Sequence, residues 1–494
     1  MKPIRILIFI CILFIITLGI ALVFPTEGIS ISKNLNLNFS FRFSELKNAS
    51  PQYADITSIL SDNETLEFDS TLIDSSATRL ANIKIDTIRA NAKTLKSKVQ
   101  RIEYPSGDTT ILYTFFQKLD NAKGKRVRIM HYGDSQIEGD RITGYLRNRF
   151  QRHFGGSGPG FMPALPGHAE SASIIHKASH NWIKHSVYYK KDTILPHRKF
   201  GVLGSFARFT SYQADSSNSN STVQKAWIEF NKSGMAYSSV RNFTECRVFY
   251  GHVNNPFIVK GYINDSLTWF EEVDTVQNTK SFKWQFTSPP SRFRIEFEGT
   301  KSPDVYAISL DSPKGVSVDN LPFRGSSGTE FTRLDFSQIK QMSRHINSGL
   351  IILEFGVNIV PHMVRNYNYY ERALTRQLKY LKYIFPHTPI LVTSVSDMSM
   401  RKGNYYVTYP NIGKIKTAQR NAAKNANCIY WDLQQAMGGD NSMPSWVFAQ
   451  PTLASKDFIH FNRRGGHIIA QMLFNAIMQE YEHYKKLQSF ALNQ

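Results

Sequence analysis

Ser135, within the stretch HYGDSQIEGD (residues 131–140), is a candidate nucleophile. A serine hydroxyl attacks a carbonyl only when a base lies beside it, and that base is usually a histidine oriented by a carboxylate. Asp457 and His460, three residues apart in SKDFIHFNRRGGH, could supply this pair. Gly-Asp-Ser is also a common turn sequence, because each of its residues tolerates or hydrogen-bonds an irregular backbone. A catalytic triad is therefore expected only if the fold brings the two segments together.

Further residues could donate hydrogen bonds to the oxyanion that forms during acyl transfer. Asn358 comes shortly after an apolar segment, where its side-chain amide could donate or could simply close a turn. Gly325 follows another such segment, and a glycine lets the backbone approach a ligand closely. Gly328 is an alternative to Gly325. The backbone N–H of Ser135 itself is the third expected donor.

Alternating segments of two kinds predict the elements that position these residues. Short apolar runs predict strands, and runs with apolar residues three or four apart predict helices. The predicted strands are 127–133, 315–320, 350–355, 389–395 and 428–433, and the predicted helices are 141–154, 332–346, 368–385, 414–426 and 465–487. Such alternation implies parallel βαβ units, which place ligands beyond the carboxyl ends of the strands. The candidate residues all follow predicted strands, so we expect them at one edge of the sheet.

This ordered set of residues resembles the SGNH (GDSL-type) hydrolase family. The Ser, Gly, Asn and His blocks of the family look like Ser135, Gly325, Asn358 and His460, and Asp457 completes the triad. The resemblance covers about residues 125–165 and 315–487. It implies an α/β fold with a flavodoxin-like, three-layer parallel sheet, and a serine esterase without metal or cofactor. Two motifs depart from the family: GDSQ replaces the usual Gly-Asp-Ser-Leu, and GVNIV lacks the acidic residue that often follows the Asn.

Residues 168–310 have a different pattern, with a period of two. In SRFRIEFEG (291–299), Phe293, Ile295 and Phe297 alternate with charged residues, which is typical of a half-buried strand. We expect a β-sandwich inserted into the α/β domain, with both of its ends near the catalytic edge. An insertion of this kind is similar to that of bacterial peptidoglycan O-acetylesterases, where it resembles a carbohydrate-binding module. A lid or packing module is the alternative.

The aromatic content of the insertion admits two interpretations. Trp227, Trp269 and Trp284 could stack on sugar rings, but we expect at least two of them to pack in the core of the sandwich.

The N-terminus predicts export. Lys2 and Arg5 precede residues 6–24. This segment has nineteen residues without a charge and is long enough to span a bilayer as a helix. We expect a retained membrane anchor over 1–25, with a cleaved signal peptide as the alternative, and a spacer over 26–80 rich in Ser, Asn, Thr and Asp. The α/β domain is expected in two parts, 81–167 and 311–494. The expected location is the periplasm or the cell exterior.

Charge and composition argue against nucleic-acid binding, a metal site and a phosphate-binding loop. The net charge is +20, from 59 basic and 39 acidic residues, but the basic residues are scattered, so we expect a solvated surface and no nucleic-acid partner. His176, His180 and His185 have no Cys or carboxylate at ligand spacing, so a metal site is not expected. The glycine-rich GGSGPG (155–160) lacks the Lys-Ser/Thr of a phosphate loop. Cys246 and Cys428 are expected as buried thiols.

The resemblance predicts an extracytoplasmic esterase that removes O-acetyl groups from a cell-wall or extracellular glycan through an acyl-enzyme. An O-acetyltransferase acting on an exported polysaccharide is the alternative, because the triad does not determine which acceptor resolves the acyl-enzyme. A binding protein with an inactive site is a third hypothesis, and the complete set of site residues argues against it. The sequence leaves open the identity of the glycan and the oligomeric state.

Overall fold

The structure is a computed structural model that describes residues 3–23, 29–32, 35–37, 51–62, 100–188, 195–212 and 222–492. Residues 1–52 with 403–405 form one compact unit, and the rest of the chain forms another. In the first unit, α1 (Pro3–Val23) precedes the antiparallel strands β1 (Ile29–Ser32) and β2 (Leu35–Leu37). Among the described residues, no helix combines the length and apolarity needed to cross a membrane, and the anchor stays a prediction. Most of the predicted spacer, together with residues 81–99, lies outside the described residues.

The second unit is built on a mixed sheet whose strand order is β16-β4-β17-β18-β21-β3. Five of its strands are parallel: β4 (Val127–Gly133), β16 (Val316–Pro322), β17 (Ser348–Glu354), β18 (Ile390–Thr393) and β21 (Ile429–Trp431). The short β3 (Ile102–Glu103) pairs antiparallel at one edge. Numbered along the chain, the parallel strands lie in the order 2-1-3-4-5, which is the flavodoxin-like arrangement. The structure confirms the predicted parallel α/β sheet.

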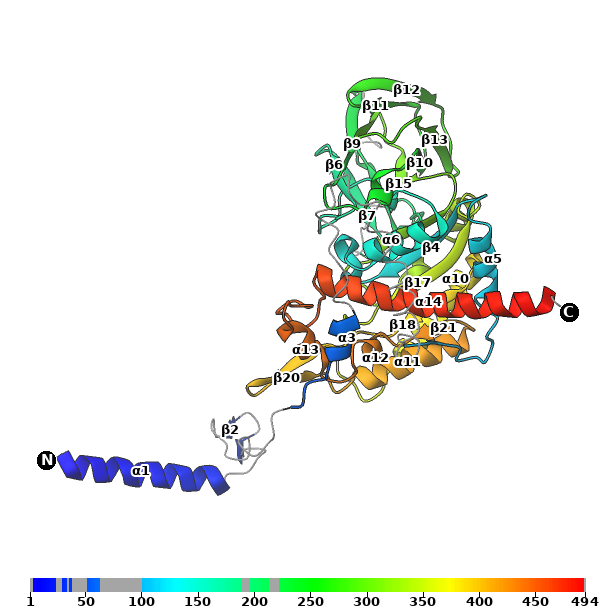
Figure 1. Cartoon of the computed structure of the whole chain (residues 1–494). Helices are drawn as coiled ribbons and strands as arrows, with labels where there is room; N and C mark the ends of the chain where they lie inside the picture. The colour runs from blue at the N-terminus through cyan, green and yellow to red at the C-terminus, as the bar shows by residue number, and fades with distance from the viewer. Residues whose placement is uncertain are drawn as a thin grey trace, which may run out of the picture. The chain divides into compact units, whose positions relative to one another are not determined.

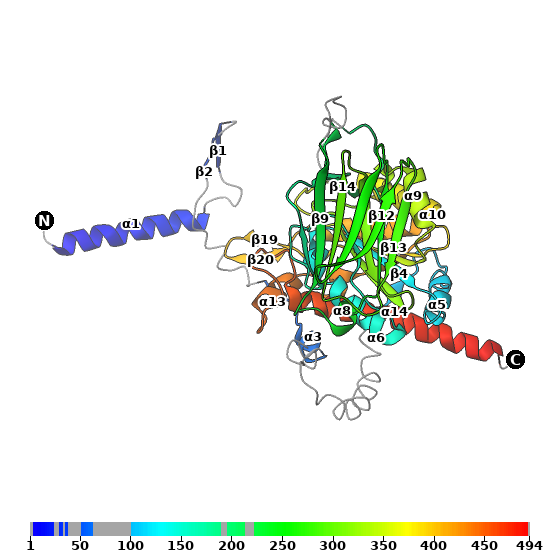
Figure 2. The same cartoon turned by 90° about the horizontal axis from the view of Figure 1, so that it is seen from above.

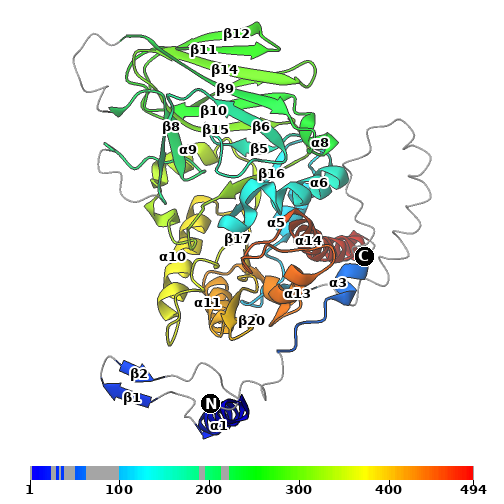
Figure 3. The ribbon, with the colours of Figure 1, turned by 90° about the vertical axis from the view of Figure 1, so that its left-hand side faces the viewer.

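Helices cover both faces of this sheet because the strands bury side chains in both directions (Figures 1 and 3). Tyr132 and Leu353 belong to the core cluster that also contains side chains of α9 (Phe336–Ser343), α10 (Asn368–Ile384) and α11 (Ile412–Asn425). Ile129 and Ile352 belong to the opposite cluster, with α5 (Tyr113–Asp120), α6 (Thr143–Phe154) and α14 (Arg463–Leu492). The result is the three-layer arrangement that the apolar strands predict.

Several elements differ from the predicted ones. The helix predicted over 332–346 is divided: a 3-10 turn, η2 (Phe331–Arg333), comes first, and α9 begins after Asp335, whose carboxylate accepts a hydrogen bond from the Gln338 N–H at 2.8 Å. Such a side-chain cap defines the start of a helix. The unpredicted elements are β3, α3 (Thr57–Asp62), α12 (Leu433–Ala436), α13 (Ser442–Phe448) and the hairpin of β19 (Ser399–Lys402) and β20 (Tyr405–Thr408). They are too short to produce a readable periodicity.

The inserted segment forms two antiparallel sheets that face each other (Figures 2 and 3). One sheet contains, in order, β12 (Ser266–Val273), β11 (Phe257–Ile263), β14 (Arg292–Gly299), β9 (Gln224–Lys232) and β6 (Ile174–Ala178). The other contains β13 (Lys280–Gln285), β10 (Glu245–Gly251), β15 (Asp304–Asp311), β8 (Ser205–Arg208) and β7 (Ile183–Ser186), and β5 (Gly160–Met162) pairs with β15. α8 (Ser238–Arg241) connects β9 to β10. Phe293, Ile295 and Phe297 face the shared core, as their alternation predicts.

The two ends of the insertion enter the α/β domain at opposite ends of the parallel strands: the first at their carboxyl ends and the second at their amino ends. Near the first end, the Ser171 hydroxyl donates to Asp140, which is part of the turn that begins with Ser135, at 3.1 Å. At the second end, β15 leads to Gly315, whose carbonyl accepts from the N–H of Val127 at the amino end of β4. The expectation that both ends lie near the catalytic edge is therefore wrong for the second end. It was wrong because the second end leads into β16, which runs parallel to β4 and therefore begins at the amino end of that strand.

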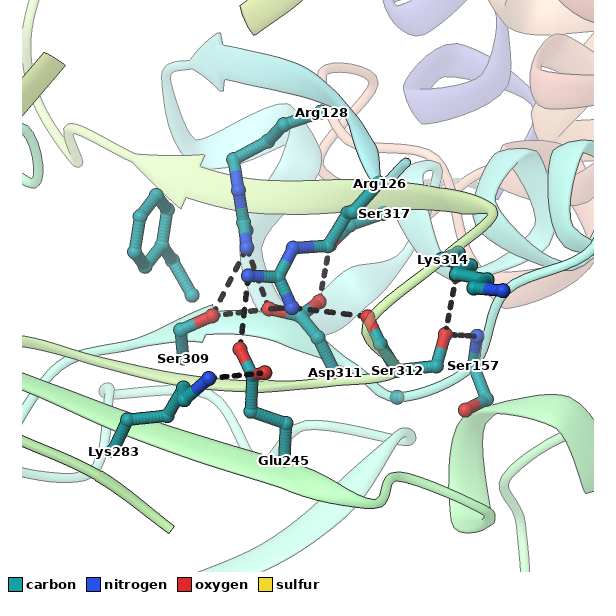
Figure 4. Close-up of polar contacts among 12 residues, drawn as sticks. Arg126, Arg128, Ser157, Glu245, Lys283, Ser309, Asp311, Ser312, Lys314 and Ser317 are labelled. Atoms are coloured by element: carbon teal, nitrogen blue, oxygen red, sulfur yellow. Dashed lines mark hydrogen bonds and ion pairs between the residues drawn. The ribbon is translucent and has the colours of Figure 1, made fainter. Parts of the chain in front are cut away.

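A buried cluster of charges joins the sandwich to the parallel sheet (Figure 4). The Arg128 side chain, on β4, is only 4 % exposed and forms ion pairs with Asp311 on β15 and Asp319 on β16. Arg126 pairs with Glu245 on β10 at 3.0 Å. Burial works to raise the pKa of Asp311, but Arg128 and Arg126 outweigh it and bring the pKa to about 2. The Arg128–Asp311 and Arg126–Glu245 ion pairs thus join the sandwich to the parallel sheet, while Asp319 pairs with Arg128 within that sheet.

Candidate active site

The structure brings Ser135, His460 and Asp457 into one hydrogen-bonded chain. Ser135 is the first residue of the 3-10 turn η1 (Ser135–Asp140), directly after β4, and His460 lies in the loop before α14. The Ser135 hydroxyl lies 2.8 Å from His460 Nε2, and His460 Nδ1 lies 2.8 Å from Asp457 Oδ2. With the ring proton on Nδ1 facing the carboxylate, Nε2 is left to accept the serine proton. The His460 and Asp457 side chains are 27 % and 44 % exposed, so the chain is open to solvent at one end.

Asp457 also closes the turn that carries His460. Its Oδ1 accepts hydrogen bonds from the backbone N–H groups of Ile459 at 2.9 Å and His460 at 3.0 Å. Partial burial works to raise the pKa of Asp457, but the hydrogen bonds from the His460 ring and from these two N–H groups outweigh it and hold that pKa below its usual value. The carboxylate therefore stays ionised beside the imidazole at neutral pH. One residue both shapes the loop and orients the base, which explains the short spacing of the two residues in the sequence.

Phe458 supports the same turn from a left-handed backbone conformation. Its φ is 59°, which is unusual for a residue with a large side chain. The ring stacks on that of Tyr406, with 3.6 Å between the ring centroids. This packing holds the strained residue in place two positions before His460.

Asp134 connects the nucleophile turn to the loop that carries Asn358. Its Oδ1 accepts from the N–H of Gln136 at 3.0 Å, and its Oδ2 accepts from the N–H groups of Gly356 at 3.0 Å and Val357 at 3.3 Å. Burial raises the pKa of Asp134, and the nearby Glu354 carboxylate raises it further against the effect of these N–H groups, to about 7. Sequence reasoning assigned no role to Asp134, although its place between Gly133 and Ser135 was a signal.

We expect the Asp134 carboxyl to make stability depend on pH between about 4 and 7. Because its folded-state pKa of about 7 lies above the ordinary 3.8, the stability that the neutral form provides is complete below pH 3.8 and is lost as the pH rises through about 7. Thermal unfolding midpoints of the wild type and of Asp134→Asn, measured across this range, should show the wild type losing stability relative to the variant. A difference that stays constant with pH would contradict this prediction.

The predicted oxyanion donors lie at the carboxyl ends of the two strands that flank β4. Gly325 follows β16 with a φ of 78°, and a Cβ placed there would meet open space. Its N–H has no hydrogen-bond partner among the residues that the structure describes. The N–H of Gly328 instead donates to the Ser326 hydroxyl at 2.9 Å, and the glycine packs against Phe355. The structure therefore favours Gly325 over Gly328 as the donor.

Asn358 follows β17 and is exposed. Its Nδ2 donates one hydrogen bond to the Ser326 carbonyl at 2.8 Å, which orients the amide and leaves its second N–H available. Because Ser326 is next to Gly325, the two candidate donors are held together by this bond. The N–H of Ser135 lies at the start of a helical turn, where N–H groups have no acceptor within the turn, so it stays the third candidate donor.

The other residues noted in the sequence pack against neighbouring side chains or are buried. Trp284 is buried and packs edge-on against Trp269, with their ring centroids 4.2 Å apart, so these two belong to the sandwich core as expected. Trp227 lies half-buried under the Arg294 guanidinium. His176 stacks on Phe230 and His185 contacts Phe206, and the described residues contain no group of His, Cys, Asp or Glu suited to a metal ion. Cys246 and Cys428 are buried free thiols.

No protein-family model matches the sequence, and no curated protein matches it either. A solved structure of a peptidoglycan O-acetylesterase aligns with a TM-score of 0.61 and 18% identity, over 77% of this chain and 99% of that one. A GDSL-like lipase from Parabacteroides merdae aligns with a TM-score of 0.25 and 18% identity, over 33% of this chain and 72% of that one. An acetyl xylan esterase aligns with a TM-score of 0.26 and 14% identity, over 33% and 81%. These two alignments are too partial to support a conclusion. This chain thus shares its fold with a peptidoglycan O-acetylesterase, in agreement with the predicted resemblance.

Proposed function

We propose that this protein is a serine esterase that removes O-acetyl groups from a glycan outside the cytoplasm. The observation that carries the proposal is the chain of two 2.8 Å contacts from the Ser135 hydroxyl through His460 to Asp457. It lies at the carboxyl edge of a parallel sheet, where open α/β folds place their chemistry. The fold supports the same proposal, because a peptidoglycan O-acetylesterase shares it.

In the proposed reaction, His460 Nε2 takes the proton of the Ser135 hydroxyl as Oγ attacks the acetyl carbonyl. The N–H groups of Ser135 and Gly325 and the free N–H of the Asn358 amide receive the oxyanion. The sugar oxygen leaves with the proton from His460, and an acetyl-serine remains. Water, deprotonated by His460, then attacks the acetyl-serine, releases acetate and restores the Ser135 hydroxyl. Asp457 stays ionised throughout and stabilises the imidazolium.

The overall charge of the chain supports an anionic glycan as substrate. The whole chain carries a net charge of +20. A basic surface raises the local concentration of a polyanion. We also propose that residues 1–25 anchor the protein in the membrane, with the domain facing the periplasm or the cell exterior, because an uncharged run follows Lys2 and Arg5.

The proposed function is tested by labelling with a fluorophosphonate and by product analysis. The reagent should phosphonylate one serine, and peptide mass spectrometry should place the adduct on Ser135. The enzyme should release acetate from O-acetylated peptidoglycan fragments. If acetylated acceptor sugars accumulate faster than free acetate when an acetyl donor is supplied, the enzyme is a transferase instead. A protein that neither reacts with the reagent nor releases acetate would overturn the proposal.

A further inference from the structure

Gln136, the residue after the nucleophile, joins the two sides of the candidate site through a buried amide. Its side chain is only 2% exposed. Its Nε2 donates to the carbonyl of Ile459 at 2.6 Å and to the hydroxyl of Ser396 at 3.1 Å. Its Oε1 accepts from the N–H of Phe461 at 3.3 Å. Three loops, which carry Gln136, Ser396 and His460, therefore meet at one amide.

Two of these hydrogen bonds bracket the proposed base. Ile459 and Phe461 are the immediate neighbours of His460, and Gln136 is the immediate neighbour of Ser135. The amide thus spans from the backbone beside the nucleophile to the backbone on both sides of the imidazole. Arg141 fixes the near end of this connection, because its guanidinium donates to the carbonyls of Ser135 and Gln136, each at 3.0 Å. The same two backbone segments carry Ser135 Oγ and His460 Nε2, which lie 2.8 Å apart.

The Gln136 amide satisfies both backbone groups at this position. The Ile459 carbonyl needs a donor and the Phe461 N–H needs an acceptor, and a carboxamide offers both at once. The leucine that is usual in the resembling family has neither and would leave the two buried backbone groups unpaired. An ionised glutamate would accept from Phe461 but would place an oxygen against the Ile459 carbonyl. A protonated glutamic acid would restore a donor and an acceptor.

We propose that Gln136 is a positioning residue that holds His460 at hydrogen-bonding distance from Ser135. This inference rests on the proposed function, and it concerns the geometry of the triad rather than its chemistry. Gln136 touches the loop of the base but not the reacting atoms. Its loss should therefore lower kcat more than it changes KM, because substrate binding does not use the amide.

The test uses p-nitrophenyl acetate with the full chain and the variants Gln136→Leu and Gln136→Glu. A displaced base costs on the order of tenfold to a hundredfold in rate, so we expect Gln136→Leu to lose about that much in kcat, with KM changed less than about twofold. For Gln136→Glu, the ratio of its kcat to that of the wild type should rise as the pH falls from about 8 to about 5.5, because the carboxyl takes up a proton. Measuring the ratio at each pH removes the pH effects that are common to both proteins.

Gln151→Leu is the matched control. Gln151 is also buried, at 3% exposure, and its Nε2 donates to a backbone carbonyl, that of Gly158, at 2.9 Å. It lies in the last turn of α6, away from the proposed triad. Its replacement should lower the thermal midpoint and leave kcat unchanged. If Gln136→Leu does not fold, the pH ratio of Gln136→Glu decides the question alone.

Two results separate the possible failures. A folded Gln136→Leu with wild-type kcat, or a Gln136→Glu ratio that does not change with pH, overturns the positioning role while the esterase assignment stands. If Ser135→Ala keeps its activity, the proposed function itself is wrong. The rates of the Gln136 variants then do not measure the geometry of a catalytic triad.

Discussion

Replacing Ser135 by Ala is expected to lower kcat for a small acetyl ester by about 10⁴-fold or more. The change removes the atom that would form the acetyl-enzyme, so only binding and the oxyanion donors remain to favour the reaction. Stability should hardly change, because the Ser135 hydroxyl forms a hydrogen bond only with His460 Nε2 among the described side chains, and that bond is worth about 1 kcal/mol. The measurements are initial rates with p-nitrophenyl acetate and the thermal midpoint, which should shift by less than about 2 °C.

A matched serine variant controls for the substitution itself. Ser489 lies on α14, and its exposed hydroxyl donates to the carbonyl of Lys486 at 2.7 Å. Ser489→Ala should keep both activity and stability. If Ser135→Ala retains the wild-type rate, Ser135 is not the nucleophile. A loss of activity accompanied by a large drop in the thermal midpoint would mean that the residue supports the fold instead.

Replacing Arg128 by Met is expected to produce the largest loss of stability. The change keeps an apolar chain of similar length but leaves Asp311 and Asp319 buried without their shared cation. Breaking a buried ion pair in this way costs about 3–5 kcal/mol, because an uncompensated charge remains in a region of low dielectric constant. Urea denaturation followed by circular dichroism measures the change in the free energy of unfolding.

An exposed arginine provides the comparison. Arg292 pairs with Asp265, and their side chains are 34% and 73% exposed, so Arg292→Met should cost less than about 1 kcal/mol. Adding Asp319→Asn to Arg128→Met should recover part of the lost stability, since Asp319 loses its ion-pair partner in Arg128→Met whereas Asp311 keeps Arg126 at 3.7 Å. A loss for Arg128→Met no greater than that for Arg292→Met would show that water reaches the cluster and replaces the arginine.

Features with a local signal could be predicted from the order of residues alone. Apolar runs such as 350–355 correctly predicted the parallel strands, and the alternation of Phe293, Ile295 and Phe297 predicted the inward face of β14. These predictions succeed because side chains repeat every two residues in a strand and every 3.6 in a helix, so burial leaves a periodic trace in the chain. The position of Ser135 after one strand and of His460 before the last helix followed from the same pattern.

The pairing of buried polar groups across the chain became visible in the folded structure. Arg128 and Asp311, Asp134 and Gly356, and Gln136 and Ile459 are each more than 150 residues apart and share no motif. The choice of Gly325 over Gly328 depended likewise on a hydroxyl, that of Ser326, that no pattern distinguishes. Periodicity indicates which positions are buried, but it does not indicate which hydrogen-bond or ion-pair partner a buried group has. Those partners are set by the packing of whole elements, because a buried donor or acceptor must be satisfied by whatever group the fold brings to it.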